Sequence, residues 1–220
     1  MGVYTGVKAL PSGAALVIDF ANSKCYPGTG STIYDLSGNG LNATIAGSLS
    51  YSSANKGILV FPGTTGNYVT SFGPNLSTTN HTVIVGSRYQ PGATQGGRIL
   101  SSGLNNWLLG HHGTSQNNCG DYYSEGWVYN PSSGGGGDQW HIYTALGNYS
   151  SDSWTVYRDN VQLASNNAGS QGPNKFELGR WRSNSEYSLA HVSFLLAWDR
   201  LLTASEMTQV FNSYRDRFGL

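Results

Sequence analysis

The stretch "YDLSGNG", residues 34–40, places an aspartate, a serine and an asparagine at alternate positions and closes with glycine. It begins like the calcium-binding loop of an EF-hand, which needs a bidentate glutamate at its twelfth position and a helix on each side. Counting from Asp35, the twelfth residue is Ala46, and the segment "LNATIAG" after the stretch has the β-branched pattern of a strand. We therefore predict a tight turn, in which Asp35 and Ser37 bind nearby backbone N–H groups and the two glycines take positive φ.

Short β-type runs separated by turn residues continue outward from this stretch, with no helical pattern until the end of the chain. The runs are 14–20, 43–47, 57–61, 67–72, 81–89, 97–103, 106–112, 126–130, 140–147, 153–159, 160–165, 175–180 and 189–198. About a dozen strands at this spacing predict a two-sheet antiparallel sandwich. A length of 220 residues suits one such domain.

Two local patterns are specific. In "SWTVYRDNVQLAS", Asp159 and Asn160 separate two alternating runs, which predicts a hairpin with a two-residue turn. In the last twenty residues the apolar period changes, and Thr203 with Glu206 predicts a capping box, flanked by a hydrophobic staple of Leu202 and Met207. One short amphipathic helix should therefore pack on the sandwich near the C-terminus.

The composition narrows the function. Twelve basic and twelve acidic residues give a net charge of zero, which disfavours nucleic acid or an anionic membrane as partner. No apolar run is long enough to cross a bilayer, and the first residues lack the basic flank and apolar core of a signal peptide. The two cysteines, Cys25 and Cys119, lack metal-ligand spacing, so we expect two thiols rather than a disulfide framework.

Three stretches together resemble the concanavalin A-like superfamily, and specifically its laminin G-like modules. The first runs from "LVIDF" through "YDLSGNGLNATI" to "GILVFPGTTGNYV", the second is "QWHIYTALGNYSSDSWTVYRDNVQL", and the third is "HVSFLLAWDRLLTASEMTQVFN". The resemblance covers the chain from about residue 14 onward and implies an antiparallel jelly-roll sandwich with one short C-terminal α-helix. Such sandwiches serve as lectins, adhesion modules, glucanases and virion proteins, so the fold does not choose a function.

The opening motif, with "GRILSSGLNNWLLGHHG" and "EGWVYN", is similar to modules of tailed-bacteriophage structural proteins. This implies display on a virion surface, as a capsid decoration, fibre or appendage component that is oligomeric in the assembly. Residues 1–13 precede the sandwich of residues 14–220, and we interpret them as an arm that docks onto other virion proteins. The alternative, from a different class, is a carbohydrate-binding lectin-like module that recognises a host-surface glycan.

We expect no enzymatic activity. A glucanase on this fold needs two carboxyl groups on one strand, as in E-x-D-x-x-E, and none of the four glutamates has an acidic residue two positions away. The chain also lacks a G-x-S-x-G elbow and a recognised cysteine nucleophile motif. A hydrolase remains an alternative only if distant carboxylates converge in the fold.

We expect no obligatory metal. His111 and His112 are adjacent, so on a strand they would point to opposite faces and could not share one ion. The laminin G-like resemblance implies that a Ca²⁺ ion at the rim is an option, with Asp121, Asp138 and Asp152 in loop-like stretches as candidate ligands.

The richest candidate surface for a ligand lies between residues 105 and 129, where aromatic and amide side chains gather. Aromatic faces stack on sugar rings while amides bind hydroxyls, and binding sites generally combine the two. The candidate residues are Asn106, Trp107, His111, His112, Tyr122, Tyr123 and Trp127. The alternative is that Trp107 and Trp127 are strand residues that fill the core, as large aromatic side chains usually do.

Overall fold

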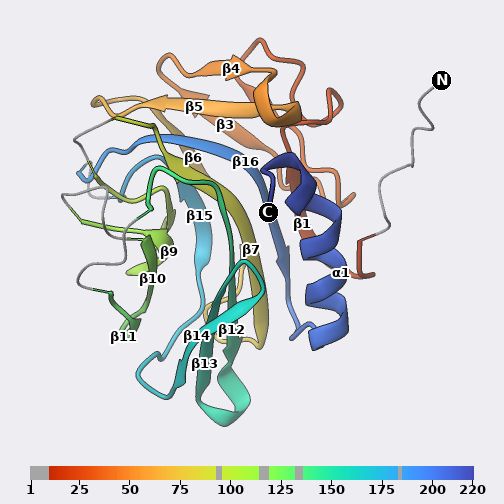
Figure 1. Ribbon diagram of the computed structural model, residues 1–220, viewed down its shortest axis with the longest axis vertical. Coiled ribbons are helices and arrows are strands. Elements are labelled where there is room, and N and C mark those ends of the chain that lie inside the picture. Colours follow the sequence, from red (N-terminus) through yellow and green to blue (C-terminus); the bar gives the residue numbers. More distant parts are fainter. Residues whose placement is uncertain (1–9, 93–95, 114–118, 132–135, 183–184) are drawn as a thin grey trace.

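Two antiparallel sheets face each other in the computed structural model, which describes residues 10–92, 96–113, 119–131, 136–182 and 185–220 (Figure 1). Sheet I has the order β14-β13-β12-β7-β16-β5-β4, and β1 pairs with β16 beside β5. Sheet II has the order β11-β10-β9-β8-β15-β6-β3-β2. The predicted antiparallel sandwich is therefore confirmed.

The strands of sheet I are β1 (Ala14–Asp19), β4 (Ser50–Ser52), β5 (Ile58–Pro62), β7 (His81–Tyr89), β12 (His141–Asn148), β13 (Ser153–Arg158), β14 (Val161–Asn166) and β16 (Leu189–Trp198). The strands of sheet II are β2 (Thr32–Ile33), β3 (Ala43–Ala46), β6 (Tyr68–Asn75), β8 (Leu100–Ser102), β9 (Trp107–His111), β10 (Cys119–Ser124), β11 (Trp127–Tyr129) and β15 (Asn174–Leu178). The helical elements are α1 (Ala204–Tyr214) and three single 3₁₀ turns, η1 (Ala54–Lys56), η2 (Tyr149–Ser151) and η3 (Arg215–Arg217). No helix in these described ranges is long and apolar enough to cross a membrane.

The main core lies between the sheets and follows from the two-residue period of the strands. In β13, Trp154 and Val156 lie two positions apart on one face of the strand, and both are fully buried in this core. The turn after this strand takes positive φ at both Asp159 and Asn160, at 52° and 65°, which gives the tight hairpin that these two residue types favour. The aromatic side chains Trp107, Trp154, Tyr143 and Phe176 are among the largest fully buried groups.

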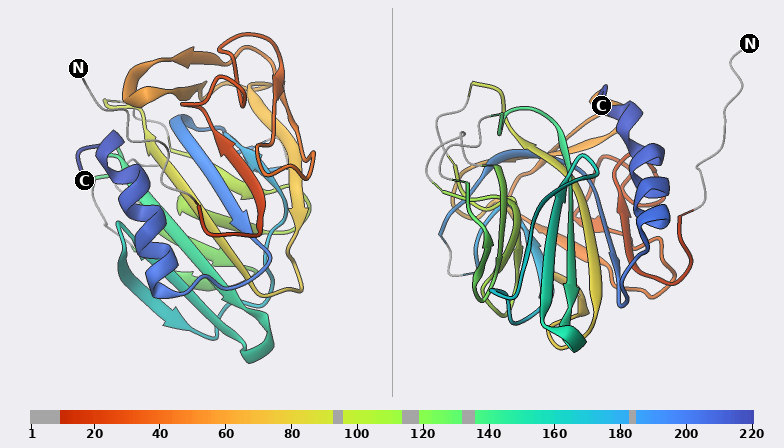
Figure 2. Two further views of the ribbon diagram at one scale, coloured as in Figure 1. Left: turned by 90° about the vertical axis from the view of Figure 1, so that its right-hand side faces the viewer. Right: turned by 60° about the horizontal axis from the view of Figure 1, so that its bottom comes forward.

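A second apolar layer lies between sheet I and α1, which packs beside β1 and β16 (Figure 2). Met207, Val210 and Tyr214 of the helix are buried against residues that include Phe194 and Trp198 of β16. The predicted capping box is present, since the Thr203 hydroxyl accepts a hydrogen bond from the Glu206 N–H at 3.2 Å and the Glu206 carboxylate accepts one from the Thr203 N–H at 2.9 Å.

The stretch 34–40 forms a turn built around the Asp35 carboxylate. One oxygen accepts hydrogen bonds from the backbone N–H of Val17 at 3.0 Å and of Ser37 at 2.9 Å. The other accepts from the Ser37 hydroxyl at 2.7 Å and the Leu41 N–H at 3.2 Å. Both glycines have positive φ, at 90° and 72°, so the predicted turn is confirmed. The carboxylate therefore serves protein N–H and O–H groups and fastens the turn to β1.

An ion pair fastens the other end of β1 to the last turn of the chain. The Arg217 guanidinium donates to both oxygens of Asp19, at 2.7 and 2.8 Å, and both side chains are about one-tenth exposed. The Arg217 guanidinium also lies 4.4 Å from the centre of the Tyr214 ring. Bidentate geometry of this kind gives the strongest arginine–carboxylate contacts.

The segment before β1 is described from residue 10. The carbonyl of Pro11 accepts a hydrogen bond from the Trp198 indole at 3.2 Å, and that of Ser12 accepts one from Arg200 at 3.1 Å. Residues 10–13 of the predicted docking arm therefore lie against the sandwich, while residues 1–9 lie outside the described residues.

Candidate functional site

The predicted ligand-binding residues divide between the core and the surface of sheet II at β9, β10 and β11. Trp107, His111 and Tyr122 are fully buried and contribute to the packing between the sheets. The prediction that these three bind a ligand is wrong, because the strand period turns them inward, as the core alternative for Trp107 required. His112, Tyr123 and Trp127 reach the surface, and the core alternative is therefore wrong for Trp127.

His111 shows why a histidine in an aromatic-rich strand can be structural. Its ring lies edge-on between Tyr89 and Tyr143, with centroid distances of 4.8 and 5.1 Å. Burial lowers its pKa to about 3, so the imidazole is neutral in the folded protein. His112 lies outside this packing and contacts Trp127 at the surface, so the two adjacent histidines diverge as expected.

Four surface side chains, His112, Tyr123, Trp127 and Glu186, form what we call the Trp127 cluster. Tyr123 and Trp127 are direct partners across β10 and β11, and their rings meet edge to face at 5.0 Å and 73°. The His112 ring lies 5.3 Å from Trp127, and its Nε2 is 3.7 Å from the Glu186 carboxylate. Trp127 is 38% exposed, which is unusual for so large an apolar side chain.

Buried polar contacts hold the Glu186 side of this cluster in place. Arg98 is 5% exposed, donates to Glu186 at 2.7 Å and to the Asn106 side-chain oxygen at 2.6 Å, and lies over the Trp181 ring. The backbone N–H of Asn106 in turn donates to Glu125 at 2.7 Å. Asn106 therefore supports the cluster by orienting Arg98.

Glu186 of the cluster and the neighbouring Glu125 have left-handed backbone conformations. The φ angle is 55° at Glu125, in the β10–β11 turn, and 51° at Glu186. Such conformations are costly for residues other than glycine, and they persist only where surrounding contacts fix them. Here the contacts are the hydrogen bonds of the two carboxylates, so the cluster is held rigidly.

The sequence pattern did not reveal Arg98, Glu125 or Glu186 as part of this site. Arg98 and Glu186 are 88 residues apart and meet only because both flank the same end of sheet II. Spacing along the chain carries no signal for such a contact. Glu186 has no acidic residue two positions away, so the sequence offers no reason to single it out.

Asp121 is a buried carboxylate in β10, two residues before Tyr123 and therefore on the same face of the strand. Its pKa is raised by burial to about 7, although the backbone N–H groups of His112 and of Asp121 itself lower that pKa in part. Neither N–H group meets the geometry of a hydrogen bond, and both carboxylate oxygens lack a partner in the described structure. Ionisation of Asp121 therefore carries a cost that its surroundings do not offset.

The carboxylates of sheet II do not form the pair that glycoside hydrolases use. Glu177 lies in β15 and Asp121 in β10, with β8 and β9 between them, so three strand spacings or about 14 Å separate their backbones. Hydrolytic carboxyl pairs are about 5 to 9.5 Å apart. Glu177 is moreover paired with Arg180 at 3.1 Å.

The candidate calcium ligands also lie apart. Asp121 lies in a strand, so the expectation of a loop position is wrong for it. Asp152 caps η2 and accepts a hydrogen bond from the Trp154 indole at 3.2 Å. In the part of the chain that the structure describes, no group of three or more histidines, cysteines or acidic residues could hold a metal.

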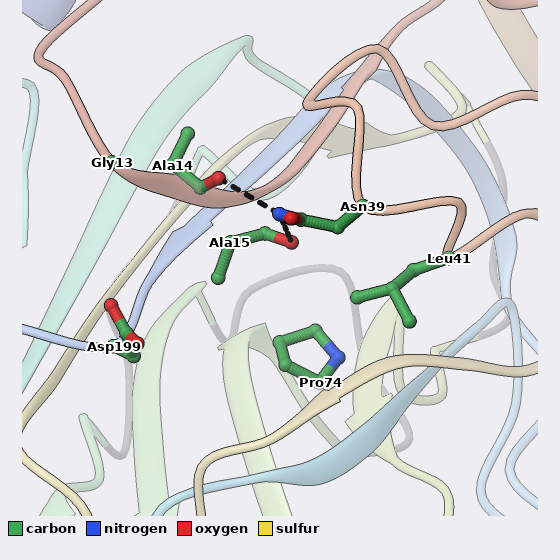
Figure 3. A pocket seen from close by; sticks show the side chains of 7 residues that line it. All are labelled: Gly13, Ala14, Ala15, Asn39, Leu41, Pro74 and Asp199. Atoms are coloured by element: carbon green, nitrogen blue, oxygen red, sulfur yellow. Dashed lines mark hydrogen bonds between the residues drawn. The ribbon is translucent and has the colours of Figure 1, made fainter.

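A depression lies elsewhere, beside the turn of residues 34–40 (Figure 3). It has a volume of about 440 Å³, and its lining residues are Gly13, Ala14, Ala15, Asn39, Leu41, Pro74 and Asp199. The Asn39 amide that faces it already donates to the carbonyls of Ala14 and Ala15, at 3.2 and 3.1 Å. The depression therefore offers a ligand fewer free polar groups than the Trp127 cluster, and we place the candidate site at the cluster.

Comparison with known proteins relates this chain to others through its fold. No protein-family model matches it, and no curated protein sequence does. Among solved structures, the binding domain of Paraclostridial Mosquitocidal Protein 1 aligns with a TM-score of 0.65 and 12% identity over 95% of this chain and 53% of that one. The botulinum neurotoxin serotype D binding domain aligns with a TM-score of 0.66 and 10% identity. The alignment covers 91% of this chain and 51% of that domain.

Trypanosoma rangeli sialidase, solved in complex with sialic acid, aligns with a TM-score of 0.63 and 16% identity over 95% of this chain and 34% of the enzyme. This chain thus spans about half of each toxin binding domain and about a third of the sialidase. At these identities the similarity is one of fold. The chain is a two-sheet β-sandwich that shares its fold with parts of these toxin binding domains and of this sialidase.

Proposed function

We propose that this chain is a non-enzymatic binding module that holds a carbohydrate at the Trp127 cluster. The observation that carries the proposal is an exposed tryptophan that meets the Tyr123 ring edge to face and the His112 ring at a tilt, beside the Glu186 carboxylate. Indole faces bind the apolar faces of sugar rings, while carboxylate and imidazole groups bind hydroxyls. The fold neighbours that are described as binding domains support a receptor- or glycan-binding role in general.

The rigidity of the cluster supports the same proposal. Each sugar hydroxyl contributes little binding free energy. A site therefore gains affinity when its own side chains lose little conformational freedom on binding. Arg98 fixes Glu186, and the left-handed conformation of Glu186 is part of the same arrangement. The free site therefore already has the orientation that a ligand would need.

Glycan-array binding followed by calorimetry on one identified glycan tests this proposal. Trp127→Ala should abolish detectable binding, and Tyr123→Ala should weaken it. Tyr149→Ala is the matched control, because Tyr149 is an aromatic residue of similar exposure, at 43%, on a different loop. Undiminished binding by Trp127→Ala would refute the proposed site. Trp107→Ala is unsuitable as a probe, because that side chain is fully buried.

Display on a phage virion remains a prediction of the sequence resemblance and is compatible with a carbohydrate-binding module. Copurification of the chain with assembled particles at a defined copy number would support a decoration, fibre or appendage role. A protein that is always free of particles would refute that role without affecting the carbohydrate proposal.

A further inference from the structure

A second polar group with aromatic neighbours lies on the outer face of sheet I. Arg88 of β7 and His191 of β16 are direct partners across these strands. Alternation along β7 places Arg88 on the same face as Ile84, which packs in the layer under α1. This site belongs to the opposite sheet from the Trp127 cluster, so it does not depend on the proposed carbohydrate site.

Arg88 uses only one of its three nitrogens within the described structure. Its Nε donates to the His191 Nδ1 at 3.1 Å, and the two terminal nitrogens have no hydrogen bond there. Neither terminal nitrogen is among the fully buried polar atoms without a partner, so both reach solvent. Burial lowers the pKa of Arg88, while Asp138 acts on it through charge alone and without a hydrogen bond.

Four of the other arginines in this protein are paired with carboxylates. Arg98, Arg180, Arg200 and Arg217 each hold a carboxylate within 3.1 Å. Arg88 has no such partner in the described ranges. The planar N–H groups of a guanidinium fit a carboxylate best, and in Arg88 these donors are unused.

The neighbouring aromatic rings fix the orientation of Arg88. Its guanidinium lies 5.0 Å from the centre of the Trp140 ring, and Phe218 stacks on that indole at 4.5 Å and 19°. The His191 ring lies 6.2 Å from Trp140, tilted by 30°. Because Trp140 is itself 7% exposed, this packing holds the guanidinium in one plane.

His191 holds Arg88 in place through its Nδ1. Its Nδ1 accepts from Arg88, so in the neutral imidazole the proton is on Nε2. Burial and the adjacent Arg88 charge lower the pKa of His191 to about 4, which keeps the ring neutral near pH 7. The two side chains together thus present no free acceptor.

We propose that Arg88 forms a binding site for a ligand carboxylate, in which its two terminal N–H groups pair with the two oxygens while the His191 Nδ1 holds the Arg88 Nε in place. The carboxylate could come from an acidic saccharide or from a peptide, and both have the same planar anion. Its arrival next to His191 would favour the imidazolium form and so raise the pKa of His191.

Nuclear magnetic resonance of the histidine rings in the full chain tests this proposal. The probes are methyl glucuronide, its uncharged analogue methyl glucoside, acetylglycylglycine and inorganic phosphate. We expect the His191 signals to shift with glucuronide, with acetylglycylglycine or with both, and the His191 pKa to rise. A response to glucuronide alone would identify an acidic saccharide as the source, and one to acetylglycylglycine alone a peptide; either result supports the proposal.

Three variants complete the experiment. Arg88→Gln should weaken carboxylate binding by about tenfold or more, since a charge-assisted pair contributes at least that factor. Arg88→Lys keeps the charge and should also weaken binding, because it lacks the planar fork. Arg215→Gln is the control, at an exposed arginine paired only loosely with Asp216. Equal shifts with methyl glucoside, equally tight binding of phosphate, or unchanged affinity in both Arg88 variants would overturn the proposal.

Discussion

Replacing Asp121 by asparagine should stabilise the protein at alkaline pH and should not stabilise it at acid pH. The folded state holds this carboxyl at a pKa of about 7, against a usual value of 3.8. Because the folded pKa is the higher one, the penalty is absent below about pH 4, grows as the pH rises, and is complete above pH 7. At full ionisation this difference corresponds to roughly 4 kcal/mol as an upper limit.

The gain in Asp121→Asn should be smaller than that limit. A buried amide without partners carries its own cost of about 1–3 kcal/mol, and it is present at every pH. We therefore expect the variant to be more stable than the parent by about 1–3 kcal/mol at pH 8, and no more stable than the parent at pH 5.

Urea unfolding of both proteins at pH 5 and pH 8 measures this effect. The parent protein also loses stability below pH 6.5, because burial lowers the pKa values of His81 and His111 to about 4 and 3 and these rings must stay neutral in the fold. Both proteins share this effect of the two histidines, so it cancels in the difference between their free energies of unfolding. Asp216→Asn, at a carboxylate that is 79% exposed, is the control. The reasoning about Asp121 fails if its difference in unfolding free energy is the same at both pH values.

Three further substitutions test the contacts that hold the fold. Asp35→Ala removes the acceptor for three backbone N–H groups and one hydroxyl, and should lower the free energy of unfolding by about 3 kcal/mol in urea titrations; a loss below 1 kcal/mol would contradict this. Asp19→Asn leaves the Arg217 charge buried without its partner and should lower the free energy of unfolding by about 3 kcal/mol. The double variant with Arg217→Gln should lose less than the sum of the two single losses. Additive losses would mean that the pair is not coupled. Thr203→Ala removes the N-cap of α1 and should cost about 1 kcal/mol by thermal unfolding, and an unchanged midpoint would argue against the cap.

The sequence was informative where a structure depends on local chemistry. The 34–40 turn, the Asp159-Asn160 hairpin and the capped helix each rest on residues within a few positions of one another, and all three are confirmed. The two-sheet architecture followed from the alternation of apolar residues and from the absence of helical periodicity before residue 203.

The candidate site was predicted only in part. His112, Tyr123 and Trp127 lie together, but Trp107, His111 and Tyr122 face inward. A bulge in β10 between Cys119 and Asp121 shifts which residues face outward, and the sequence gives no sign of where that bulge lies. Arg98 and Glu186 meet through the packing of distant segments, for which a single sequence contains no local pattern.

The turn of residues 34–40 also has a consequence for solubility. Strand β1 pairs with β16 on one side only, and an unpaired strand edge is a template for aggregation. Along the other side, Val17 exchanges hydrogen bonds with Asp35 and Leu36, and Asn39 binds the carbonyls of Ala14 and Ala15. Polar side chains thus occupy the positions that a strand from a second molecule would otherwise take. Variants that loosen this turn should aggregate through β1 before they unfold.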